Sequence, residues 1–264
     1  MKITVFTSNQ PRHLHLIESL AGVADEVFAV QECSTIAPGS VQDFYQKSEV
    51  MQEYFGHVLA AEKEVFGEPR LLTGTIHHMA VRMGDLNLLS MESLAGALDS
   101  DIYVVFGASF IKGPLCEFLV EKGTYNIHMG VSPYYRGHST NFWALYDGRA
   151  QYVGATIHML TKGLDSGPIL FHALPEIEAV EPFLLGMKSV KAAHRSLVAK
   201  IADGTLGGIE GVAQDKSLQL RYSKGAEFTD EIAREYLDRL ASPEEVLAQL
   251  KATKESDFVS PTYG

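Results

Sequence analysis

The chain has 264 residues, with 46% hydrophobic and 21% charged side chains and a formal net charge of −11. This composition is typical of a globular protein and excludes disorder, and the negative charge disfavours a nucleic-acid partner. No window approaches the roughly 20 consecutive apolar residues of a membrane span, and the N-terminus lacks a signal-peptide pattern, so we expect a cytoplasmic protein without membrane contact. The two cysteines cannot form a disulfide framework, and the histidines show no metal-ligand spacing, so we expect no bound metal.

The first elements predict a β-α-β unit. Residues 2–8 alternate and are rich in β-branched side chains, which is typical of a strand. A helix follows up to about Gly22, with Asn9 as its N-cap and Pro11 in its first turn. A second strand is predicted over residues 26–31. This order favours an α/β fold with a Rossmann-like, doubly wound, mostly parallel sheet.

The middle of the chain continues the alternation after one interruption. Residues 37–70 predict a helical excursion outside the sheet, because apolar side chains recur there at helical spacing. The pair His77-His78 would point to opposite faces of a strand. Further elements are predicted in chain order: a helix over 89–98, strands over 101–107, 124–128 and 152–160, helices over 112–123 and 139–146, and a long helix over 182–202.

The C-terminal part has a different character. A strand is predicted over residues 218–222, followed by amphipathic helices over 230–240 and 243–250, with Thr229 and Ser242 as their caps. We therefore expect a main catalytic domain over residues 1–205 and a short C-terminal appendage over residues 206–264. The amphipathic helices of this appendage could support a homodimer.

Dinucleotide binding is disfavoured by the turn after the first strand. A Rossmann dinucleotide site needs a glycine-rich turn there, so that the backbone can approach a pyrophosphate. This chain instead has residues 7–12, Thr-Ser-Asn-Gln-Pro-Arg, and no Walker-type loop occurs elsewhere.

Three polar residues suggest a catalytic site. Asn126 and His128 are two apart on a predicted strand, so their side chains face the same way. Asp165 lies in a glycine-bounded turn. An amide can stabilise an oxyanion, an imidazole can move a proton, and a carboxylate can orient the imidazole, which together suit direct acyl transfer. The residues alone also allow the alternative that all three are ordinary caps and turn residues.

The same stretch resembles the formyltransferase family that uses 10-formyltetrahydrofolate. The family pattern is Asn-x-His, then Pro-x-x-Arg-Gly, then a downstream Gly-[Leu/Ile/Met]-Asp-[Thr/Ser]-Gly-x-Ile-Leu. The matching positions are Asn126, His128, Pro133, Arg136, Gly137 and residues 163–170. One position departs from the pattern, because many members have Pro-Ser after the His, where this chain has Met129-Gly130.

The resemblance implies a fold, a mechanism and a formyl donor. It implies a sheet of about seven strands with a folate cleft, in which Asn126, His128 and Asp165 are catalytic. Asn126 and protonated His128 would stabilise the oxyanion, and Asp165 would hold His128. The implied cofactor is 10-formyltetrahydrofolate, bound by Phe106, Gly107, Ala108, Ser109, Phe110, Ile111, Gly163 and Leu164. Core packing is the alternative role for Phe106 and Phe110.

The tail, residues 221–231, resembles that of nucleotide-sugar N-formyltransferases. This resemblance implies that the acceptor is a nucleotide-linked amino sugar used in surface polysaccharide biosynthesis. Its binding residues would be Arg12, His13, Tyr134, Tyr135 and Arg136, since arginine forks match phosphate geometry and tyrosines can stack. Solvated arginines and packed tyrosines are the alternative for these positions. The alternatives for the activity are transfer to another small amine such as glycinamide ribonucleotide, hydrolysis of the formyl-folate, and a catalytically silent binding module.

Overall fold

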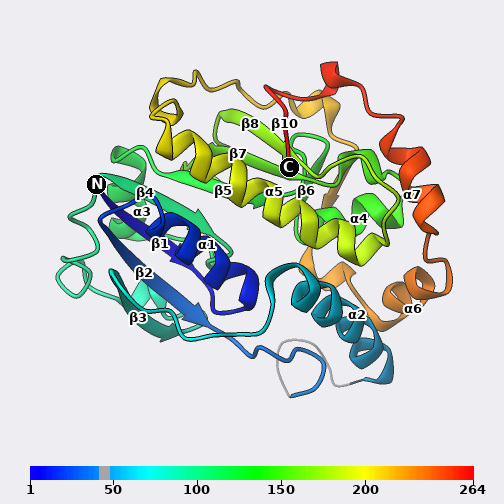
Figure 1. The fold of residues 1–264 in the computed structure, drawn as a ribbon, viewed down its shortest axis with the longest axis horizontal. Coiled ribbons are helices and arrows are strands. Elements are labelled where there is room, and N and C mark those ends of the chain that lie inside the picture. Colours follow the sequence, from blue (N-terminus) through cyan, green and yellow to red (C-terminus); the bar gives the residue numbers. More distant parts are fainter. Residues whose placement is uncertain (42–47) are drawn as a thin grey trace.

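An eight-stranded sheet forms the centre of the computed structural model, which describes residues 1–41 and 48–264 (Figure 1). The strands lie in the order β10-β8-β7-β5-β4-β1-β2-β3, and neighbours are parallel except for the pairs β5–β7 and β7–β8. Their bounds are β1 (Lys2–Thr7), β2 (Glu26–Cys33), β3 (Ile76–Arg82), β4 (Ile102–Phe106), β5 (Tyr125–Met129), β7 (Ala155–Met159), β8 (Ile169–Leu174) and β10 (Thr262–Tyr263). The predicted α/β, mostly parallel sheet is confirmed.

Helices cover both faces of this sheet. The helices α1 and α5 lie together on one face, and α3 lies on the other (Figure 1). The helices are α1 (Pro11–Ala21), α2 (Glu49–Phe66), α3 (Gly113–Glu121), α4 (Thr140–Tyr146), α5 (Pro182–Ala202), α6 (Asp230–Asp238) and α7 (Pro243–Leu250). None of the helices in the described residues is long and apolar enough to cross a membrane.

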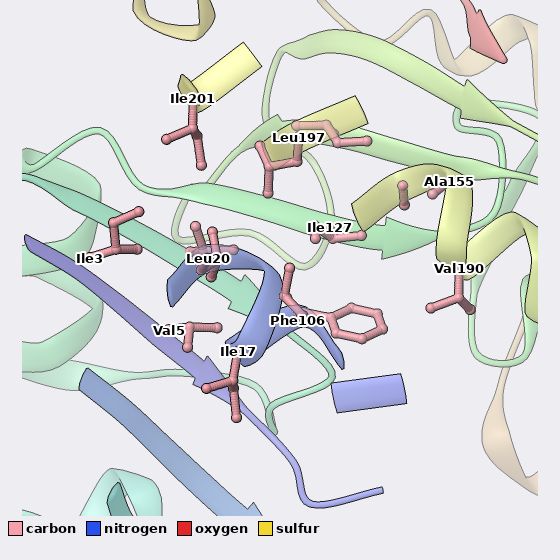
Figure 2. Packing of buried hydrophobic residues seen from close by; sticks show 14 of the residues in the cluster. Ile3, Val5, Ile17, Leu20, Phe106, Ile127, Ala155, Val190, Leu197 and Ile201 are labelled. Atoms are coloured by element: carbon pink, nitrogen blue, oxygen red, sulfur yellow. The ribbon is translucent and has the colours of Figure 1, made fainter. Parts of the chain in front are cut away.

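The core between the sheet and α1 and α5 explains why the strands near the centre are apolar. Figure 2 shows side chains of both helices meeting those of the strands, among them Leu20 of α1, Leu197 of α5, Val5 of β1 and Ile127 of β5. A strand covered on both faces reads as a continuous apolar run, as β4 does. This rigid core holds the carboxyl ends of β1, β2, β4 and β5 along one edge.

The excursion expected over residues 37–70 contains the long helix α2, while its residues 42–47 lie outside the described part of the chain. Ser48 caps this helix by accepting a hydrogen bond from the backbone N–H of Met51. Among its apolar side chains, Tyr54 and Ala61 are buried. The helix packs against α5, α6 and α1 and adds no strand to the sheet.

Two local predictions in the N-terminal half are wrong. The N-cap of α1 is Gln10 and not Asn9, because the Asn9 side chain exchanges hydrogen bonds with the backbone of Ser34. The segment 89–98 forms consecutive turns in place of a helix. The Ser90 hydroxyl accepts the N–H of Ser93 there, and Leu94 still reaches the core beneath the sheet.

Two of the longer strands, β3 and β8, were not predicted. The edge strand β3 follows β2 in parallel and contains the His77-His78 pair. The His77 ring stacks on Phe28, and His78 bonds the Gln31 side chain at 2.9 Å, so both have structural partners. The strand β8 begins directly after the Asp165 turn and pairs with β7.

The C-terminal residues pack on the rest of the chain at several points. The short strand β9 (Arg221–Ser223) pairs with β6 (Tyr135–Gly137), and β10 joins the main sheet beside β8. The helix α7 has the predicted bounds, and Thr229 and Ser242 cap α6 and α7 as expected. The division of the chain at residue 205 stays a prediction.

Candidate functional site

The structure brings Asn126, His128 and Asp165 together. Asn126 and His128 occupy alternate positions of β5, and the turn between β7 and β8 carries Asp165 toward them. The Asn126 amide donates to Oδ1 of Asp165 at 3.2 Å. Nδ1 of His128 lies 3.4 Å from Oδ2 of the same carboxylate. Asp165 adopts a φ of 42°, a left-handed conformation that Asp tolerates better than most residues.

A second histidine, His158, completes this cluster, and the sequence analysis missed it. It lies on β7 opposite Asn126 in the antiparallel register and is fully buried. Its Nδ1 is 2.9 Å from the carbonyl oxygen of Met159 and therefore carries a proton. Its Nε2 is then free to accept from the Asn126 amide at 3.1 Å. His158 thus orients Asn126, and only the strand register could have revealed it.

The electrostatics of the cluster favour a neutral imidazole beside an ionised carboxylate, in place of the protonated His128 that the resemblance implied. Burial lowers the pKa of His128, and the Asp165 carboxylate opposes that effect. Burial also raises the pKa of Asp165, but His128, His158 and Asn126 outweigh it and bring the pKa to about 2. A neutral His128 with its proton on Nδ1, facing Asp165, presents a lone pair on Nε2.

A cavity of about 430 Å³ opens next to this cluster, and we call it the Asp165 cavity. Its size lies in the range of small-molecule sites. Nε2 of His128 is buried and has no hydrogen-bond partner among the described residues. The cavity is also lined by every residue predicted to bind folate: Phe106, Gly107, Ala108, Ser109, Phe110, Ile111, Gly163 and Leu164. Phe106 is buried, whereas Phe110 is exposed.

Two glycines explain how the chain folds around the cluster. A Cβ on Gly167 would lie 1.7 Å from the carbonyl oxygen of Met159, so only glycine lets the turn close behind Asp165. Gly130 has a φ of 120°, and a Cβ there would lie 2.3 Å from the Thr140 hydroxyl. Thr140 therefore fills the space beside position 130.

A second cavity of about 560 Å³ adjoins the first, and we call it the Arg12 cavity. Both cavities are lined by Phe106, Gly107, Met129 and His138. The rest of its wall comes from residues that follow β1, β2 and β3, from the start of α1, and from one side of α2. The Asp165 cluster and Arg12 thus belong to neighbouring cavities that share these wall residues.

Arg12 and His13 line this second cavity, as predicted for acceptor contacts. The Arg12 guanidinium bonds Glu62 of α2 at 2.8 Å, and the Glu62 side chain is 2% exposed. Arg12 is the only Lys or Arg among the described residues that line either cavity. Burial lowers the pKa of His13 well below its usual value, and Thr7 bonds its Nδ1 at 2.8 Å, so His13 is a neutral wall residue.

The remaining predicted acceptor residues lie elsewhere. Tyr134 and Tyr135 are buried, and neither lines the two cavities. Tyr134 stacks on Tyr152, and the Tyr135 hydroxyl donates to Asp147 at 3.1 Å, so both pack in the core. Arg136 lies on β6 outside both cavities, although its charge contributes to lowering the pKa of His128.

Part of the chain is similar in sequence to known formyltransferases. Residues 89–198 match the model of the formyl transferase family. The chain is 29% identical over 131 residues to a methionyl-tRNA formyltransferase of Synechococcus sp. (strain JA-3-3Ab). The aligned region covers 49% of this chain and 39% of that protein. The chain thus spans well under two thirds of the length of this relative.

Two solved structures share the fold. A formyltransferase of Anoxybacillus kamchatkensis, in complex with UDP-4,6-dideoxy-4-formamido-L-AltNAc and tetrahydrofolate, has a TM-score of 0.52 and 17% identity, covering 95% of this chain and 100% of that one. An N-formyltransferase of Helicobacter canadensis, in complex with folinic acid and dTDP-3-aminofucose, has a TM-score of 0.51 and 15% identity, covering 89% of this chain and 79% of that one.

Proposed function

We propose that this chain transfers a formyl group from 10-formyltetrahydrofolate to an amine, because its residues 89–198 match the formyl transferase family model. The family match includes Asn126, His128 and Asp165 and agrees with the resemblance that the motifs indicate. The single observation that carries the proposed activity is the unpartnered Nε2 of His128, which is held by Asp165 at the wall of the Asp165 cavity.

The Asp165 cavity fits the folate donor, which supplies an activated formyl group. Its wall is formed by the loop after β4, residues 107–111, and by Gly163 and Leu164 of the turn before Asp165. Backbone and apolar side chains dominate this wall and suit a planar ring. The formyl carbon would then lie beside His128, and the amine would arrive from the Arg12 cavity across the shared wall.

The residues of the cluster account for the proton movements of the transfer. As the amine forms a bond to the formyl carbon, Nε2 of His128 takes the proton that the nitrogen loses. Asp165 stabilises the resulting imidazolium through Nδ1. The imidazolium then donates its Nε2 proton to the leaving nitrogen of the folate as the old C–N bond breaks and the carbonyl of the new formamide re-forms. Asn126 redirects one of its two amide hydrogens to the developing oxyanion.

The acceptor we propose is a nucleotide-linked amino sugar of surface polysaccharide biosynthesis. Support comes from the ligands of the two similar structures, which are a UDP-linked formamido sugar and dTDP-3-aminofucose. The Arg12 cavity, of about 560 Å³, has room for such a sugar ring. The net charge of −11 argues against a tRNA acceptor, because a phosphate backbone would be repelled. Both cysteines are free, which fits a reducing cytoplasm.

A coupled assay tests the proposed function. The purified chain is incubated with 10-formyltetrahydrofolate and a panel of UDP- and dTDP-linked amino sugars, with glycinamide ribonucleotide and methionyl-tRNA alongside. Tetrahydrofolate release and the mass of each acceptor are measured together. We expect release to match formylation of one nucleotide sugar. Formylation of glycinamide ribonucleotide or tRNA alone would contradict the acceptor, release without formylation would indicate a hydrolase, and folate binding without release would indicate a binding module.

A further inference from the structure

A buried carboxylate, Glu32, lies at the end of β2, outside the catalytic cluster. It is 1% exposed, and among the described residues no Lys, Arg or His forms an ion pair with it. Ser109 donates its backbone N–H to Oε2 at 2.6 Å and its hydroxyl to Oε1 at 2.8 Å. The backbone N–H of Gly84 also donates to Oε1, at 2.9 Å. Every strong contact of the carboxylate is therefore made to a loop.

These contacts use both side-chain oxygens of Glu32 as hydrogen-bond acceptors. A carboxylate only accepts hydrogen bonds, so it can receive the donors of Ser109 and Gly84 at the same time. Glutamine has nearly the same shape, but its NH₂ group would face one of these N–H donors. One or more buried donors would then lose their partner, and each such loss costs about 1–3 kcal/mol.

The loops that Glu32 holds belong to the two cavities. Ser109 is part of the wall of the Asp165 cavity, and Met83, next to Gly84, is part of the wall of the Arg12 cavity. The backbone carbonyl of Glu32 accepts the hydroxyl of Ser8, which also lines the Arg12 cavity, at 2.8 Å. One residue thus links the walls of both cavities.

We infer that Glu32 is a positioning residue that fixes the folate-side loop relative to the acceptor side. This inference rests on the proposed function, because it takes the Asp165 cavity as the donor site. A displaced Ser109 loop would weaken folate binding and misplace the formyl carbon relative to the amine. Misplacement by a fraction of an ångström lowers the rate of the chemical step as well as the affinity.

The test compares Glu32→Gln with the unaltered full chain. Calorimetric titration with tetrahydrofolate gives the Kd, and the coupled assay gives kcat and the KM of the acceptor. We expect Glu32→Gln to raise the Kd of tetrahydrofolate about ten- to hundredfold and to lower kcat about tenfold or more. Ser109→Ala removes one of the contacts and should raise the Kd about three- to tenfold.

Asp147→Asn is the matched control. Asp147 is a hydrogen-bonded carboxylate with a 27% exposed side chain, which accepts from Arg221 at 2.7 Å and lies outside both cavities. It should keep the Kd and kcat of the unaltered chain even where the melting temperature falls. If Glu32→Gln fails to fold, Ser109→Ala decides the question.

Two different failures can be separated. A Kd and a kcat within about twofold of the unaltered chain, in every folded variant of Glu32 and Ser109, would overturn the positioning role alone. An unaltered chain that does not bind tetrahydrofolate would overturn the proposed function and this inference with it.

Discussion

Asp165 controls both the orientation and the protonation of His128. Its carboxylate faces Nδ1 of His128 and counteracts the burial that lowers the pKa of the ring. In the proposed mechanism the neutral ring acts as the base, so activity should be lost as the pH falls through the pKa of His128. The pKa of Asp165 is about 2, so this carboxylate stays ionised throughout that range.

We expect Asp165→Asn to change the pH profile as well as the rate. Without the negative charge the pKa of His128 falls further, so the acidic limb of the kcat/KM profile should move to lower pH. The plateau should drop by about 10²- to 10⁴-fold, because the imidazolium loses its partner. Steady-state kinetics across the acidic range measures both effects, with Asp147→Asn as a control. An acidic limb that stays in place would contradict the assigned role.

The turn between β7 and β8 places Asp165 in the catalytic cluster. Gly167 lies against the carbonyl oxygen of Met159 and close to His158, so its missing side chain allows the two strands to pair just behind Asp165. In contrast, Gly186 lies inside α5, where an added Cβ would meet no atom within 4 Å. The two glycines form a matched pair for substitution.

We expect Gly167→Ala to destabilise the fold by about 3 kcal/mol, because backbone must shift to admit the methyl group. Gly186→Ala should instead stabilise the fold by about 0.5–1 kcal/mol, because alanine favours a helix interior. Urea denaturation of both variants gives the free energies of unfolding. Equal unfolding midpoints for Gly167→Ala and the unaltered chain would show that the turn is not tightly packed.

The success of the sequence-based predictions varies with the element. The bounds of α5 and α7 are predicted correctly, because each has proline in its first turn and a clear apolar stripe. The edge strand β3 lacks such a pattern, since most of its side chains are exposed. The turns at 89–98 bury Leu94 with helix-like spacing, so periodicity alone could not distinguish them from a helix.

At the candidate site, sequence motifs identified the cluster residues, but they did not show which distant residues each side chain contacts. The Asn126, His128 and Asp165 cluster is foreseen because motif residues mark both segments that form it. His158 and Glu32 are not foreseen, because their partners lie across strands or loops whose register the sequence does not state. Tyr134 and Tyr135 were wrongly predicted to bind the acceptor, because aromatic residues beside a motif can also pack in the core.

Buried neutral histidines make the stability of the whole molecule sensitive to acid. Nε2 of His172 donates to the carbonyl oxygen of Ser132 at 2.8 Å, and Nδ1 accepts from the N–H of Val259 at 2.9 Å. Burial lowers the pKa of His172 from 6.5 to about 4. In the unfolded chain His172 is therefore protonated below about pH 6.5, whereas in the folded chain it is protonated only below about pH 4.

The free energy of unfolding should accordingly fall as the pH decreases through this window. His172 alone should contribute about 2 kcal/mol of loss between about pH 7 and pH 5, and buried His13 and His194 act in the same direction. Urea unfolding at several pH values measures this slope. The non-titrating His172→Gln variant should show a shallower slope, and an unchanged slope would contradict the assignment.

Formyl transfer at His128 is the central claim, and a single-turnover comparison tests it most directly. Enzyme in excess is mixed with labelled 10-formyltetrahydrofolate and with the free-amine form of the acceptor that the panel identifies, and label transfer is followed for the unaltered chain and His128→Ala. We expect His128→Ala to slow transfer by about 10²- to 10⁴-fold while the Kd of tetrahydrofolate changes by less than about threefold. Transfer by His128→Ala at a near-normal rate would contradict the account.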